Sequence, residues 1–273
     1  MLRVGALIVG VALLAALVGP AVTPFDPAHQ QLALRLAAPS LAHPFGLDEL
    51  GRDILARVLA GARISFVVGL TVVIVSSVVG TLLGAIAGYF GGRVDDVISR
   101  VIDTLMAFPG LLLAIALVAV LGPSLVNVLV ALTIIGWVGY ARLVRGQVLR
   151  AREFEYVQAA RALGAGTARI LWKHVIPTAI PAVVVQATLG MAGAIIGEAS
   201  LSFLGLGVQP PTPSWGTMLN GGRAHILDAP HLTLFPGLAI ALLVLGLNFL
   251  GDGLRDRIDP RSHTTDNRPH PAR

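Results

Sequence analysis

Long runs without a charged residue constrain this chain more than any other feature. A helix needs roughly 20 apolar residues to cross the hydrocarbon core of a bilayer. Uncharged runs of at least that length occupy residues 4–25, 64–92, 104–141, 175–197 and 232–251. The run at 104–141 is long enough for two helices, and Gly122, Pro123 and Ser124 mark a turn near its middle. We therefore predict an all-α, polytopic membrane protein with six transmembrane helices.

The remaining composition agrees with a lipid environment. Charged residues make up 13% of the 273 residues, whereas a soluble domain carries about 25%. The chain contains no cysteine, which excludes disulfides, cysteine-ligated zinc and thiol catalysis.

Basic residues are distributed unevenly between the runs. With a cytoplasmic N-terminus, fifteen Lys and Arg residues fall in inner segments and five in outer segments. The positive-inside rule then predicts that both termini are cytoplasmic. It also explains the basic net charge without a nucleic-acid partner. The first run could instead be a cleaved signal peptide, but it is longer than usual for one and no Ala-x-Ala site follows it.

The chain divides into four regions by this reading. They are an N-terminal transmembrane helix (1–25), an outer segment (26–63), a core of five transmembrane helices (64–261) and a polar tail expected to be disordered (262–273). The end of the outer segment, residues 48–59, has helical periodicity and is expected to lie along the membrane surface. In the outer loop at 206–231 we expect Trp215 at headgroup level.

Small residues recur every four positions on the second run, at Ser76, Gly80, Gly84 and Gly88. This spacing places them on one helix face, where backbones can approach closely. The pattern fits either ordinary helix packing or a path that opens and shuts.

One segment between the runs, residues 142–177, is rich in charge. It holds seven of the twenty Lys and Arg residues. Residues 153–163 contain good helix formers and no Gly or Pro. Gly164 and Gly166 then interrupt the pattern, and a second short helix can begin with Thr167 as its N-cap. We predict a helix–turn–helix projection on the cytoplasmic side.

This segment resembles the EAA loop of ABC importer permeases. The family pattern is Glu-Ala-Ala, three residues, Gly, nine residues, then Ile-x-Leu-Pro. The matching positions are Gln158, Ala159, Ala160, Gly164, His174, Val175, Ile176 and Pro177. Three positions depart from the pattern: Gln158 for Glu, His174 for Ile and Ile176 for Leu. His174 is common in the peptide-importing branch, whereas Gln158 removes a charge that could make an ionic contact.

Further motifs resemble the dipeptide/oligopeptide/nickel permease family, and specifically its second, C-type permease subunit. They are HPFGLDELGRD (43–53), GARIS (61–65), GYARLVRGQ (139–147), EASLSFLGLG (198–207), QPPTPSW (209–215) and LGDGLR (250–255). The resemblance covers roughly residues 1–261.

The resemblance implies a type I ABC importer permease fold in a non-catalytic subunit of the bacterial cytoplasmic (inner) membrane. It implies a heterodimer with a homologous second permease subunit, two ATP-binding subunits that hold ATP and Mg²⁺, and an extracytoplasmic substrate-binding protein. No Walker A sequence occurs in this chain, which agrees with a separate ATPase. The cargo would be di- or oligopeptides, or alternatively nickel or another small solute. The expected ATPase-coupling residues are Glu155, Gln158, Ala159, Ala160, Arg161, Gly164, Arg169 and Pro177.

Glu198 ends a long uncharged stretch near the outer end of the fifth run. An ionisable residue within a membrane indicates function, so Glu198 could line the translocation path and bind a peptide's amino group, or pair with an Arg of a partner subunit. Alternatively, it is a structural carboxylate at the water boundary.

Other functional classes find less support in the sequence. No HExxH or Gly-x-Ser-x-Gly motif suggests an intramembrane protease. The internal repeat of many secondary transporters is not evident. Composition alone does not exclude a passive channel.

Overall fold

The computed structural model describes residues 1–258; the predicted disordered tail at 262–273 lies outside the described residues. Helices form every extended element of the described part. In chain order they are α1 (Leu2–Val22), η1 (Leu32–Leu34), α2 (Ile54–Phe90), α3 (Gly92–Met106), α4 (Gly110–Leu121), α5 (Leu125–Ala151), α6 (Glu155–Ala162), α7 (Thr167–Ile170), η2 (Leu171–Val175), α8 (Ile176–Phe203), α9 (Trp215–Gly222), η3 (Arg223–His225) and α10 (His231–Ile258).

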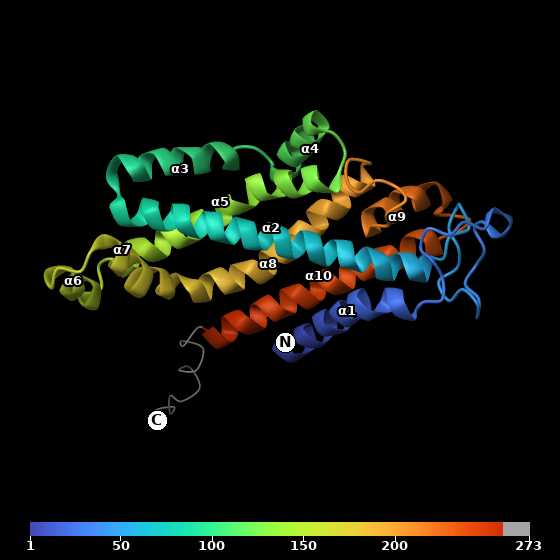
Figure 1. The fold of residues 1–273 in the computed structure, drawn as a ribbon, viewed down its shortest axis with the longest axis horizontal. Coiled ribbons are helices and arrows are strands. Elements are labelled where there is room, and N and C mark those ends of the chain that lie inside the picture. Colours follow the sequence, from blue (N-terminus) through green and yellow to red (C-terminus); the bar gives the residue numbers. More distant parts are fainter. Residues whose placement is uncertain (259–273) are drawn as a thin grey trace, which may run out of the picture.

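The long helices form one elongated bundle (Figure 1). Among the described residues, α1, α2, α5, α10 and the stretch from α7 to the end of α8 are long and apolar enough to cross a membrane. Helix α1 packs along α10, and α2 packs against α5 and α8. The α6–α7 projection lies at one end, the described part of α10 ends on that side of the bundle, and α9 lies toward the other end (Figure 1). Leu2 at the start of α1 packs against Gly253 near the end of α10.

The predicted third span is a bent pair of helices rather than one continuous helix. Helices α3 and α4 meet at an angle of 87°, and they make a sixth span if counted together. Pro109 sits at the break and precedes α4. Proline lacks a backbone N–H and disfavours helical geometry in the residue before it, here Phe108. The predicted turn at Gly122 is confirmed, with Ser124 capping α5 through the backbone N–H of Asn127.

Helix α2 begins ten residues before the second uncharged run. Residues 54–59, part of the stretch expected to lie along the membrane surface, belong to α2, which runs unbroken from Ile54 for 37 residues. Asp53 starts this helix, since its Oδ1 accepts a hydrogen bond from the N–H of Ala56 at 2.8 Å. Arg63 stays within the helix because its guanidinium donates to the carbonyls of Ala16 and Leu17 on α1. Helix α2 is about 55 Å long, well beyond the roughly 30 Å of the hydrocarbon core.

The small-residue face of α2 is the contact with α5. A Cβ atom at Gly84 would collide with the backbone of Ala141, and one at Gly80 would lie 2.5 Å from the carbonyl oxygen of Trp137. The four-residue spacing therefore serves close helix packing in this chain.

Trp215 lies inside the protein, and its expected place at headgroup level stays a prediction. The side chain is 3% exposed, and its Nε1 donates a hydrogen bond to the carbonyl of Val58 at 2.9 Å. Ser214 caps α9 in a capping box with Thr217. The Pro-rich loop thus folds back onto α2 and α8 and closes this end of the bundle.

Candidate functional site

The segment predicted to project from the bundle does so as two short helices after α5 (Figure 1). Helix α6 is close to its predicted extent, but α7 has only four residues. Gly166, not Thr167, occupies the N-cap of α7, and no side chain caps it. The chain then continues through a π-helical turn, Leu171–Val175, directly into α8. The second helix is therefore joined to a membrane span without a break.

Gly164 sets the angle between α6 and α7. Its φ is +82°, a conformation that costs other L-residues about 1–2 kcal/mol. The N–H of Gly164 bonds to the carbonyl of Arg161, and the N–H of Ala165 bonds to that of Ala160, both at 3.0 Å. This pair of bonds is a Schellman motif, which satisfies the last carbonyls of α6.

Buried aliphatic side chains fix the projection to the bundle. Val157 of α6 is 0% exposed, and Ile170 of α7 is 1% exposed. They share one apolar cluster with Val144 and Val148 of α5 and with Ala85 of α2. A force applied to the projection is therefore transmitted to these two long helices through packed contacts.

The outer surface of the projection is unusually apolar. Leu163 is 89% exposed and Trp172 is 61% exposed, and Tyr156 and Phe154 are also exposed. Arg169 and Lys173 are exposed in the same region. Large exposed apolar side chains next to charged ones are typical of a protein–protein contact.

The structure places most of the predicted coupling residues on the surface of this projection. Arg161 lies 5.7 Å from the ring centre of Tyr89 on α2, and Gln158 donates to the carbonyl of Glu153. Pro177 lies apart from the others, in the first turn of α8. Exposed side chains belong to Glu155, Gln158, Ala159, Arg161, Gly164, Arg169 and Pro177, and Ala160 is half-buried.

The sequence did not reveal two polar contacts that connect the projection's base to other helices. Arg145 of α5 donates two hydrogen bonds to the carboxylate of Asp95 on α3, one of them from Nη2 at 2.7 Å. Arg152 donates from Nη1 to the carbonyl of Gly88 at 3.1 Å. The pairing of Arg145 with Asp95 could not be predicted, because a partner 50 positions away leaves no spacing signal in the sequence.

Glu198 is completely buried on α8. Its Oε1 accepts a hydrogen bond from Ser202 Oγ at 2.6 Å, and Ser202 Oγ accepts one from the N–H of Val208 at 3.1 Å. The other oxygen, Oε2, has no hydrogen-bond partner among the described residues. This geometry fits the structural alternative, in which Glu198 holds the turn after α8. A role in the translocation path stays a prediction.

Helix α8 also borders an apolar cavity of about 360 Å³. Helices α2, α4 and α5 complete its walls, and none of the lining side chains is charged. The lining includes Val72, Gly110, Leu132, Gly136, Gly193, Gly197 and Ser200. Glu198 is not part of this lining, so the structure does not bring it together with the cavity.

Comparison with known proteins gives four findings. A family model described as "binding-protein-dependent transport system inner membrane component" matches residues 80–264. The dipeptide transport system permease protein DppC of Alkalihalophilus pseudofirmus is 47% identical over 258 residues, which cover 94% of this chain and 85% of the relative. The glutathione transport system permease protein GsiD of Pectobacterium atrosepticum is 49% identical over 223 residues, covering 82% and 74%. A solved structure of the inward-facing MetNI methionine ABC transporter has the same fold, with a TM-score of 0.56 at 20% identity over 74% of this chain and 94% of that one.

Proposed function

Because the chain belongs to the family of binding-protein-dependent transport system inner membrane components, we propose that it carries di- or oligopeptides into the cell as one of two permease subunits of an ATP-driven importer. It is a non-catalytic, multi-pass membrane subunit of an ABC importer. The observation that carries the peptide assignment is the pair of relatives at 47% and 49% identity, named for a dipeptide and for glutathione, which is itself a tripeptide.

The α6–α7 projection is the part of the chain that docks on an ATP-binding subunit. Its exposed Leu163 and Trp172 supply apolar contact area, and Arg161 and Arg169 supply charge around it. ATP and Mg²⁺ are held by that partner. Closure of the two ATP-binding subunits displaces the projection, and the packed contacts of Val157 and Ile170 pass the displacement to α2, α5 and α8.

The remaining partners follow from the arrangement of the bundle. Both ends of the described chain lie toward the projection (Figure 1), so a cytoplasmic projection puts α9 and residues 26–53 on the outside. A substrate-binding protein delivers cargo there. A homologous second permease subunit forms the other half of the path, against the apolar cavity between α4, α5 and α8.

Uptake by the reconstituted complex tests this function. The complex, purified through a tag on this chain, is placed in liposomes with its binding protein outside. We expect radiolabelled dialanine to enter only when ATP is supplied on the side of the ATP-binding subunits. Entry that is unaffected by ATP depletion would contradict an importer and favour a passive channel.

The alternative cargo, nickel or another small solute, is tested in the same vesicles by competition. We expect excess unlabelled dialanine to compete with the labelled peptide and Ni²⁺ to leave uptake unchanged. ATP-driven entry of Ni²⁺ without entry of dialanine would assign the chain to the nickel importers instead.

A further inference from the structure

A polar cavity lies at the end of the bundle opposite the α6–α7 projection. It has a volume of about 260 Å³ and is half open to the surface. Its walls come from three segments far apart in the sequence: the turn before α2, the loop after α8, and α9. The side chains that matter here are Glu49, Arg52, Arg57, Gln209, Thr217 and Asn220.

Two arginines in this cavity share one carboxylate. Asp48 Oδ2 lies 2.7 Å from Nε of Arg52 and 3.5 Å from Nε of Arg57. Asp48 Oδ1 is already used by the backbone N–H groups of Leu50 and Arg52. Asp48 therefore orients both guanidinium groups without satisfying their outer nitrogens.

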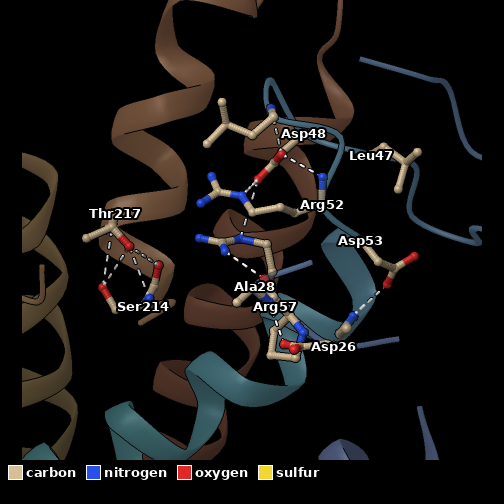
Figure 2. A network of polar contacts seen from close by, with 12 residues as sticks. Asp26, Ala28, Leu47, Asp48, Arg52, Asp53, Arg57, Ser214 and Thr217 are labelled. Carbon is tan, nitrogen blue, oxygen red and sulfur yellow. Dashed lines mark hydrogen bonds and ion pairs between the residues drawn. The ribbon is translucent and has the colours of Figure 1, made fainter. Parts of the chain in front are cut away.

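The outer nitrogens of both arginines are available for a ligand. Arg57 is 4% exposed and donates from Nη1 to the carbonyl of Pro27 at 2.9 Å. Its Nη2 and both Nη atoms of Arg52 have no hydrogen-bond partner among the described residues. The two guanidinium groups point the same way, toward the side on which Ser214 and Thr217 lie (Figure 2). These free nitrogens are not fully buried, so an acceptor that enters the cavity can reach them.

The third charged side chain of the cavity determines the kind of ligand. Glu49 lines the same space, and its carboxylate has no hydrogen-bond partner in the described part of the chain. With Asp48 occupied by the two arginines, a simple anion would face Glu49 as well as the guanidinium groups. A ligand with a carboxylate at one end and an ammonium group at the other would satisfy both.

We propose that this cavity is a binding site for a small zwitterion, with Arg52 and Arg57 holding its carboxylate and Glu49 holding its ammonium group. At about 260 Å³ the cavity lies just below the roughly 300 Å³ at which pockets for drug-sized ligands begin, so its size suits a ligand as small as an amino acid or dipeptide. The site rests on the proposed function for its natural ligand, a peptide with free termini entering from outside. Gln209 and Asn220 fix the wall, because their amide nitrogens bond to backbone carbonyls of the loop after α8 and of Phe203.

Direct binding to the complex in nanodiscs, without the binding protein, tests the site. The probes are dialanine, dialaninamide and N-acetyl-dialanine, and binding is measured by saturation-transfer difference NMR. For the wild type, we expect each blocked peptide to bind about tenfold more weakly than dialanine, because one charge-assisted contact is lost. Glu49→Gln should bind dialanine and N-acetyl-dialanine equally, and Arg52→Gln should bind dialanine and dialaninamide equally.

Two control variants accompany these measurements. Arg35→Gln changes an exposed arginine of the same outer segment and should bind all three probes as the wild type does. Arg52→Lys keeps a charge next to Asp48 in case Arg52→Gln unfolds the turn. Glu49 makes no hydrogen bond to the described chain, so Glu49→Gln should leave the fold intact.

Equal binding of the three probes by the wild type would overturn the site. So would variants that weaken only the affinity of the complex for its binding protein, since the cavity would then be a docking contact. ATP-driven uptake of dialanine is measured in parallel. If the complex discriminates between the probes but does not take up dialanine, the site is supported and the proposed cargo is refuted. If it takes up dialanine but does not discriminate between the probes, the proposed cargo is supported and the site is refuted.

Discussion

At the scale of single residues, Gly164 is the position where backbone geometry matters most for coupling. Replacing it by Ala introduces a Cβ into open space, so any effect comes from the positive φ and should cost about 1 kcal/mol at the end of α6. We expect Gly164→Ala to lower the amount of ATP-binding subunit that co-purifies with this chain. Gly166→Ala is the matched control, because Gly166 also faces open space but has a φ of −67°. Equal losses in both variants would contradict the role given to the Schellman motif.

Substitutions at Glu198 distinguish two roles for this side chain: a structural carboxylate, or a carboxylate that binds cargo. Glu198→Gln keeps an oxygen for the hydroxyl of Ser202, whereas Glu198→Ala removes it and leaves a hole. We expect Glu198→Ala to destabilise the protein by about 2 kcal/mol, seen as a lower melting temperature in detergent, and Glu198→Gln to cost little. Ser200→Ala, which removes a hydroxyl bonded only to its own helix, is the control. A Glu198→Gln variant that melts normally but loses transport would restore the path hypothesis.

Residue roles could be predicted where a local motif carries them. The turn at Gly164 was predicted because a glycine between two helical patterns marks a turn, whereas the coupling roles of the residues around it come from the resemblance and stay predictions. Arg57 and Asp95 were not found, because their partners are brought together by the fold. The pairing of Asp95 with Arg145 depends on how α3 lies against α5, and no sequence spacing encodes that.

At the scale of helices, the contact between α2 and α5 should tolerate almost no added volume. Gly84→Val would place two methyl groups against the backbone of Ala141, and we expect a loss of about 3 kcal/mol or failure to accumulate in the membrane. The yield of folded protein, measured by size-exclusion chromatography, tests this. Gly193→Ala on α8 is the control, since nothing lies within 4 Å of its added Cβ. A normal yield for Gly84→Val would show that the two helices can separate freely.

Helix boundaries could be predicted where residues near them in the sequence determine them. They could not be predicted where contacts with distant segments determine them. The runs of apolar residues located all five long helices, and Gly122 located the turn before α5. The start of α2 was missed because the charges of Arg57 and Arg63 suggested a surface segment. In the structure, each of these arginines donates a hydrogen bond to a backbone carbonyl of another segment, Arg57 to Pro27 and Arg63 to Ala16. The break at Pro109 was not predicted, because Pro109 lies within a long uncharged run.

At the scale of the whole molecule, the two ends of the bundle should lie on opposite sides of the membrane. The chain has no cysteine, so maleimide labelling of a single introduced cysteine has no background from other cysteines of this chain. We expect Leu41→Cys to react with a membrane-impermeant maleimide on intact spheroplasts, and Leu163→Cys to react only after permeabilisation. Both positions are exposed, so access alone decides the result. Labelling of Leu163→Cys in intact spheroplasts would invert the proposed orientation.

The unbroken length of α2 makes it a lever with unequal arms. Its tightest grip on α5, at Gly80, Gly84 and Gly88, lies near the end beside the projection. With Gly84 as the pivot, the short arm to Phe90 measures about 9 Å and the long arm to Ile54 about 45 Å. A push of about 1 Å at the short arm then swings the far end by about 5 Å. Arg57 lies near that far end, so under the proposed coupling a small stroke by the ATP-binding subunits would be magnified into a displacement large enough to open the proposed zwitterion site.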